Sequence, residues 1–251
     1  MPFYMPFAPL FIFFLVAALI TSITNQLLGN LQGWKSEFLE NLILCTGELA
    51  AIIAIIFLVK IYFVRGLKGF GLNVKTIIKD IPSGFVNLLT IWPIMIFAML
   101  LTMQIAKFFL GEEYEIQQHQ QLKLLTEYSQ LPLKVIIFIF AAVIVSIFEE
   151  MLFRGLFQTT IRSFIEARFW LEVPQKTTYK NSVIDRYGAW FAILISSGLF
   201  ATSHANVDHW LALFVLGVCL GYAYEKSGSL FRPIFIHSLF NAISVVLVLN
   251  Q

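Results

Sequence analysis

The fold is decided by residues 135–155, which read VIIFIFAAVIVSIFEEMLFRG. The first thirteen residues are apolar on every face of a helix, so their natural surroundings are lipid or a large apolar core. Two carboxylates, Glu149 and Glu150, and the guanidinium of Arg154 then follow without a turn residue to end the helix. Ionised groups at such a depth are costly unless they are paired or used, so this stretch predicts a functional site.

The composition excludes a soluble protein. Of the 251 residues, 59% are hydrophobic and only 13% are charged. A soluble domain has roughly 45–50% apolar and about 25% charged residues. The apolar runs are also too long for barrel strands and do not alternate. We therefore expect an all-α, polytopic bundle of transmembrane helices.

A spanning helix needs about 20 mostly apolar residues. Seven stretches meet this requirement, and an arrangement with an eighth span stays open. The predicted spans are 7–28, 41–64, 85–109, 133–157, 188–205, 208–224 and 229–249. No internal repeat or linker divides the chain, so residues 1–251 are expected to form a single membrane domain.

The placement of lysine and arginine predicts the orientation, because cytoplasmic loops carry an excess of both. In a seven-span arrangement, 13 of them fall on one side and 4 on the other. The N-terminus is therefore expected in the cytoplasm, with a plasma (inner) membrane location. If Arg154 marks the cytoplasmic end of its span, Glu149 lies about 7–8 Å inside that boundary.

Helical spacing separates the two glutamates. Residues four apart share a face of a helix, whereas adjacent residues diverge by about 100°. Glu150 and Arg154 can therefore pair and hold the structure. Glu149 points away from this pair and has no local partner. A buried carboxylate without a partner can act as a general base or acid.

Two further pairs have the same spacing in other spans. Phe200 and His204 share a face near the end of the span 188–205, so the ring of Phe200 is expected to hold that of His204. His237 and Asn241 share a face of the last span and could present two hydrogen-bond donors in one direction, as an oxyanion site requires.

Other polar or small residues favour plainer interpretations. Glu48 and Gln104 lie within spans but have no matching partners. Gly217 and Gly221 form a GxxxG pattern, which indicates close helix packing either within the chain or to a second copy of it. The two cysteines give no disulfide framework.

These motifs resemble those of the CPBP intramembrane proteases. That family includes CAAX prenyl endopeptidases and bacteriocin-processing or immunity (Abi) proteins. The family pattern is EExxxR, then FxxxH, then HxxxN or HxxxD. Here the three motifs stand as Glu149 to Arg154, Phe200 to His204 and His237 to Asn241, in the same order. The resemblance covers about residues 130–250 and leaves variable helices at 1–110.

The resemblance implies a role for each matched residue. Glu149 would polarise the attacking water, and His204 would help to orient or deprotonate it. His237 and Asn241 would stabilise the oxyanion. Glu150 and Arg154 would hold the helix.

A metal ion is a separate question. Glu149, His204 and His237 are one carboxylate and two imidazoles, a set that can hold catalytic zinc. The chain has no HExxH motif, however. The resemblance favours a mechanism with no metal, because the amide of Asn241 is better explained as a donor to an oxyanion.

The sequence thus predicts an endopeptidase that cleaves membrane-associated or lipid-anchored substrates near the cytoplasmic face. Its expected partners are a peptide or lipidated protein and membrane lipids, without nucleic acid. A homo-oligomer through Gly217 and Gly221 stays open. The alternatives are a non-catalytic immunity or scaffolding protein of the same fold, and a carrier that uses Glu149 and the histidines as a proton relay.

Overall fold

The computed structural model describes residues 6–28, 32–116, 120–172, 182–204 and 207–250. These residues form a bundle of helices and contain no strand. The long helices are α1 (Phe7–Leu28), α2 (Trp34–Tyr62), α4 (Ile77–Leu110), α9 (Ser182–Ser203), α10 (Val207–Ser227) and α11 (Phe231–Leu249). The shorter α3 (Gly66–Gly69), η1 (Val74–Thr76) and α5 (Gln120–Glu127) lie in the connections.

One helical run without a break extends from Leu131 to Glu172. Its parts are α6 (Leu131–Ile139), η2 (Phe140–Val145), α7 (Ser146–Glu149), η3 (Glu150–Gln158) and α8 (Thr159–Glu172). The parts η2 and η3 are π-helical, which means that their turns are wider than those of an α-helix. This run contains the EExxxR motif.

The all-α membrane fold is confirmed. Five helices are long and apolar enough to cross a membrane: Trp34–Tyr62, Val74–Leu110, Leu131–Glu166, Val207–Ser227 and Phe231–Leu249. Two shorter apolar helices, Phe7–Ser22 and Tyr187–Ser203, coincide with the first and fifth predicted spans. Each predicted span therefore overlaps a helix of the described residues, although most helices extend beyond the predicted ends.

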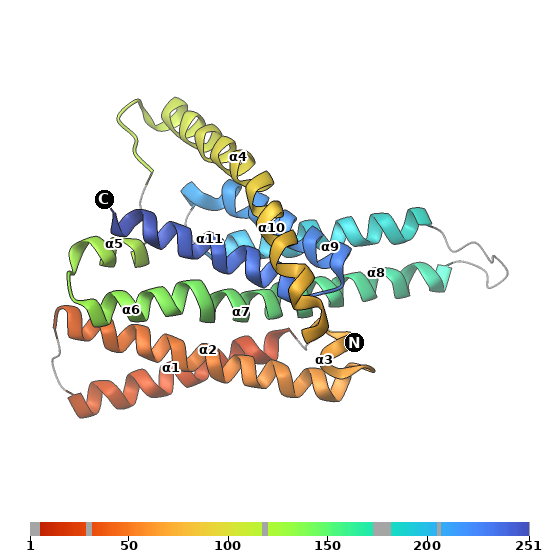
Figure 1. Cartoon of the computed structure of the whole chain (residues 1–251), viewed down its shortest axis with the longest axis horizontal. Coiled ribbons are helices and arrows are strands. Elements are labelled where there is room, and N and C mark those ends of the chain that lie inside the picture. The colour runs from red at the N-terminus through yellow and green to blue at the C-terminus, as the bar shows by residue number, and fades with distance from the viewer. Residues whose placement is uncertain (1–5, 29–31, 117–119, 173–181, 205–206, 251) are drawn as a thin grey trace.

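The run from α6 to α8 passes through the middle of the molecule (Figure 1). The hairpin of α1 and α2 packs on one side of it, and α11 packs on another. Helix α9 lies beside α8 and η3, and α10 lies between α9 and α4. The EExxxR motif is thus surrounded by helices from both halves of the chain.

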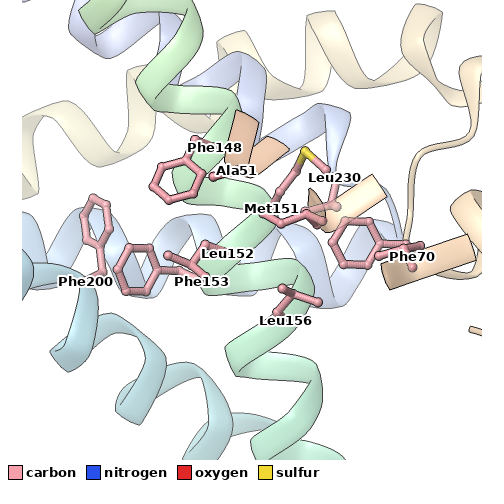
Figure 2. Packing of buried hydrophobic residues seen from close by; sticks show 11 residues of the cluster. Ala51, Phe70, Phe148, Met151, Leu152, Phe153, Leu156, Phe200 and Leu230 are labelled. Carbon is pink, nitrogen blue, oxygen red and sulfur yellow. The ribbon is translucent and has the colours of Figure 1, made fainter. Parts of the chain in front are cut away.

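A cluster of apolar side chains surrounds the motif (Figure 2). Ala51 of α2 lies beside Phe148, while Phe153 and Phe200 meet edge to face with ring centroids 5.5 Å apart. Phe70, from the connection after α3, is fully buried against the same run. Aromatic burial of this kind excludes water from the polar residues next to it.

The Phe70 ring requires a glycine opposite it. A Cβ atom at Gly155 would lie 2.2 Å from the ring, which is closer than any real contact. The connection is fixed on its other side as well, because Leu230 donates its N–H to the carbonyl of Gly71 and Tyr224 donates its hydroxyl to that of Phe70. These bonds hold the backbone that carries the ring, and the ring itself is fully buried.

We predict that Gly155→Ala lowers the stability of the protein by about 1–3 kcal/mol, the usual cost of overpacking a core. Thermal unfolding in detergent checks this. Gly198→Ala is the matched control, because Gly198 also lies in a helix but has no atom within 4 Å of its Cβ position. Equal stability of the two variants would contradict the prediction.

Candidate active site

The carboxylate of Glu150 is the centre of the polar cluster. Its Oε1 accepts one hydrogen bond from Nη1 of Arg154 and one from Nδ1 of His237, both at 2.8 Å. All three side chains are buried. The predicted i,i+4 pair of Glu150 and Arg154 is present, and the structure adds His237 of α11 as a third member.

Glu149 points away from this pair, as the helical spacing predicted. Its Oε1 lies 3.8 Å from Nε2 of His204, and its Oε2 lies 3.7 Å from Nε2 of His237. These distances are too long for direct hydrogen bonds, but they suit groups that share a bridging water. The structure therefore brings together Glu149, His204 and His237 from three separate helices.

Both imidazole rings are oriented by their Nδ1 atoms. In His204, Nδ1 lies 2.8 Å from the carbonyl oxygen of Phe200. In His237, Nδ1 lies 2.8 Å from the Glu150 carboxylate. Since a carbonyl or carboxylate oxygen accepts only, each Nδ1 carries a hydrogen and donates it. The Nε2 atoms are consequently the ones that face Glu149.

Phe200 holds these groups in place, as its spacing from His204 predicted. Its ring centroid lies 4.7 Å from that of His204 and 5.6 Å from that of His237. The guanidinium of Arg154 lies over the same ring at 4.5 Å, a cation–π contact. One fully buried phenylalanine thus contacts both histidines and the ion pair.

The amide of Asn241 is bound to the central helical run. Its Nδ2 donates to the carbonyl of Ala141 at 2.9 Å and to Oγ of Ser146 at 3.3 Å. Oγ of Ser146 also lies 3.3 Å from the Ala141 carbonyl. The amide is therefore bound to the wide turn of η2, immediately before the segment that carries Glu149.

The GxxxG pattern packs within the chain, which was one of the two alternatives left open. Arg154 Nη2 donates to the carbonyl of Gly217, and Gln158 Nε2 donates to that of Gly221, each at 3.2 Å. A Cβ atom at Gly217 would lie 2.9 Å from Ser197 of α9. This face of α10 is therefore covered by η3 and α9 of the same chain.

Two helices of the site extend past the limits of the predicted spans. Arg154 does not mark the end of its helix: its side chain is 1% exposed, and the helical run continues to Glu172. Helix α9 likewise begins at Ser182, before the predicted residue 188, and runs beside α8 (Figure 1). Inside the bundle His204 and Glu149 meet, with Nε2 of His204 3.8 Å from Oε1 of Glu149.

Residues 131–243 match the family model described as type II CAAX prenyl endopeptidase Rce1-like. This match supports the assignment of the region to the CPBP family of CAAX proteases. The matched region contains all three motifs, from Glu149 to Asn241. No curated protein and no solved structure matched the chain.

The predicted zinc ligands would be Glu149, His204 and His237. Among the residues that the structure describes, no group of three or more His, Cys, Asp and Glu side chains is arranged to hold a metal ion. Glu149, His204 and His237 face one another, but the two Nδ1 atoms are bound elsewhere and the three groups do not form such a set.

Glu48, for which the sequence predicts no role, lies near the site. Glu48 of α2 is 6% exposed, and its carboxylate interacts electrostatically with that of Glu149. The sequence indicates this residue only through its position inside an apolar span. Its partner could not be named because the sequence does not show which helices are neighbours.

We predict that Glu150→Gln destabilises the protein by about 3–5 kcal/mol, because Arg154 would be left as a buried, uncompensated charge. Thermal unfolding in detergent measures the effect. Glu166→Gln is the matched control: Glu166 pairs with Arg162 at the same i,i+4 spacing, but both side chains are about one-third exposed. Its loss should cost at most about 1 kcal/mol.

We further predict that Asn241→Ala lowers stability together with any activity, because two hydrogen bonds to the turn of η2 disappear. The expected loss of stability is about 1–3 kcal/mol, as for partners left unsatisfied. Ser146→Ala removes a second bond to the same carbonyl and should change stability in the same direction. A fully stable Asn241→Ala protein would contradict the holding role.

Proposed function

We propose that the protein is an intramembrane endopeptidase in which Glu149 activates water to hydrolyse a peptide bond. The observation that carries this proposal is the convergence of two imidazole Nε2 atoms on the Glu149 carboxylate. The family supports a protease in general terms. The site residues and their roles are our own assignment.

In the first step, Glu149 takes a proton from a water molecule and the water oxygen attacks the carbonyl carbon of the substrate. His204 orients this water through Nε2, since its Nδ1 is bound to the Phe200 carbonyl. A base in hydrogen-bond reach of its water typically contributes a rate factor of about 10²–10⁴.

His237 stabilises the negative oxygen of the tetrahedral intermediate. In its protonated form, Nε2 carries a hydrogen that can be donated to this oxygen, while Nδ1 stays bound to Glu150. Glu150 compensates the positive charge of the ring, much as the carboxylate does in a serine protease triad. Asn241 supports the site by holding the turn of η2, and the oxyanion donor is His237.

Buried hydrophobic walls and a site inside the membrane favour a substrate with an apolar or lipid-anchored end. The excess of basic residues in one set of loops supports cleavage toward the cytoplasmic side of a plasma membrane. An inactive Glu149→Gln protein should retain its substrate, so peptides that co-purify with it would identify the substrate class.

We predict that Glu149→Gln and His204→Ala each reduce hydrolysis of a reporter peptide by at least about 100-fold, while both proteins remain folded. Purified protein in detergent or vesicles is suitable for the assay. Glu112→Gln is the control, because it makes the same chemical change on an exposed loop residue. Full activity in the two site variants would exclude the proposed mechanism.

The same assay separates the alternatives. Activity that survives exhaustive chelation supports the mechanism without metal, whereas activity that is lost and then restored by zinc contradicts it. A non-catalytic immunity or scaffolding protein would instead keep its biological effect in Glu149→Gln.

A further inference from the structure

Glu48 lies on the face of α2 that packs against the EExxxR segment. The buried residues Ala51 and Ile55 follow it at helical spacing on this face, and both belong to the apolar cluster that contains Phe148 and Leu152. Helix α2 contacts both α7 and η3. The Glu48 side chain is therefore directed toward the helix that carries Glu149, about one turn from the apolar contacts.

The carboxylates of Glu48 and Glu149 each have an unused oxygen. Oε2 of Glu48 and Oε2 of Glu149 are buried and accept no hydrogen bond from the described part of the chain. Glu150 and Asp80 also have one such oxygen each, but their other oxygen is bound, in Glu150 by Arg154 and His237 and in Asp80 by Arg232. Glu48 and Glu149 repel each other when both are ionised.

We propose that Glu48 is a second carboxyl group of the catalytic centre, which faces Glu149 across the hydrolytic water and supplies the proton that the departing amine needs. This inference rests on the proposed function. It assigns the general acid to a residue outside the three motifs.

The balance of charges in the site supports a protonated Glu48. Glu48 interacts with Glu149 of the helical run and with Cys45 of α2 itself, and Glu149 in turn interacts with Glu150, Arg154 and His237. With His237 protonated, two carboxylates oppose two cations and the site is neutral. An ionised Glu48 would add an uncompensated charge within the membrane, which is unfavourable.

With this assignment, every proton in the reaction has a donor and an acceptor. Glu149 takes one proton from water as the carbon–oxygen bond forms. When the carbon–nitrogen bond breaks, the carboxyl of Glu48 gives its proton to the nitrogen, and the products are a carboxylic acid and an amine. Transfer of the proton from Glu149 to Glu48 then restores both groups for the next turnover.

The test is Glu48→Gln, measured with the reporter peptide over a range of pH. We expect kcat to fall by about 10²–10⁴-fold with KM unchanged, because the amide retains the shape of the side chain but cannot give up a proton. In the unaltered protein, kcat should decline at high pH as Glu48 loses its proton. That alkaline decline should be absent from the residual activity of Glu48→Gln.

Two further variants keep the test independent of folding. Glu48→Asp retains a carboxyl group and should recover part of the lost kcat together with the alkaline decline. Glu40→Gln makes the same change on an exposed residue two turns earlier in α2 and should leave kcat and its pH profile unchanged.

Other outcomes would overturn the inference. A rise in KM for cationic substrates with kcat retained would mean that Glu48 binds a positive group of the substrate. Unchanged kcat and pH profile in Glu48→Gln, with activity still abolished by Glu149→Gln, would reject Glu48 alone and leave the proposed function standing. Full activity in both variants would reject both.

Discussion

The rest of the structure depends on the buried ion pair between Glu150 and Arg154. A guanidinium inside a membrane protein must have an anion and further acceptors, and here Glu150, the carbonyl of Gly217 and the ring of Phe200 provide them. The same Glu150 oxygen also binds His237. One carboxylate therefore joins the central helix to α11, and its arginine partner joins that helix to α10. Breaking this pair would therefore remove contacts that hold the central helix, α10 and α11 together.

The helical run is wider than an α-helix on both sides of Glu149. The π-helical parts η2 and η3 leave backbone carbonyls in need of donors, and the surrounding helices supply them. Asn241 of α11 donates to the carbonyl of Ala141, and Ser196 of α9 donates to that of Phe153 at 2.7 Å. Such wide turns occur frequently at functional sites. Here they direct the two adjacent glutamates toward different neighbours.

The sequence predicted those features that depend on spacing within one helix. The pairing of Glu150 with Arg154, the separate direction of Glu149 and the contact of Phe200 with His204 all follow from residues three or four positions apart. It did not predict features that depend on which helices are neighbours. Glu48 had no visible partner because α2 and α7 are about a hundred residues apart in the chain. The sequence also did not show how far the helical run continues past Arg154, to Glu172.

Two glycines of α10 match the four-residue spacing of two side chains on the central helix. Arg154 and Gln158 are one turn apart, and so are Gly217 and Gly221, whose carbonyls they reach. If α10 slid along the central helix by one turn, the bulk of Leu213 or the charge of Glu225 would replace one glycine at the contact. In the observed position, both glycines lie at the contact and both side chains reach a carbonyl. The glycine pair therefore favours one position of α10 along the central helix when the bundle assembles in the membrane.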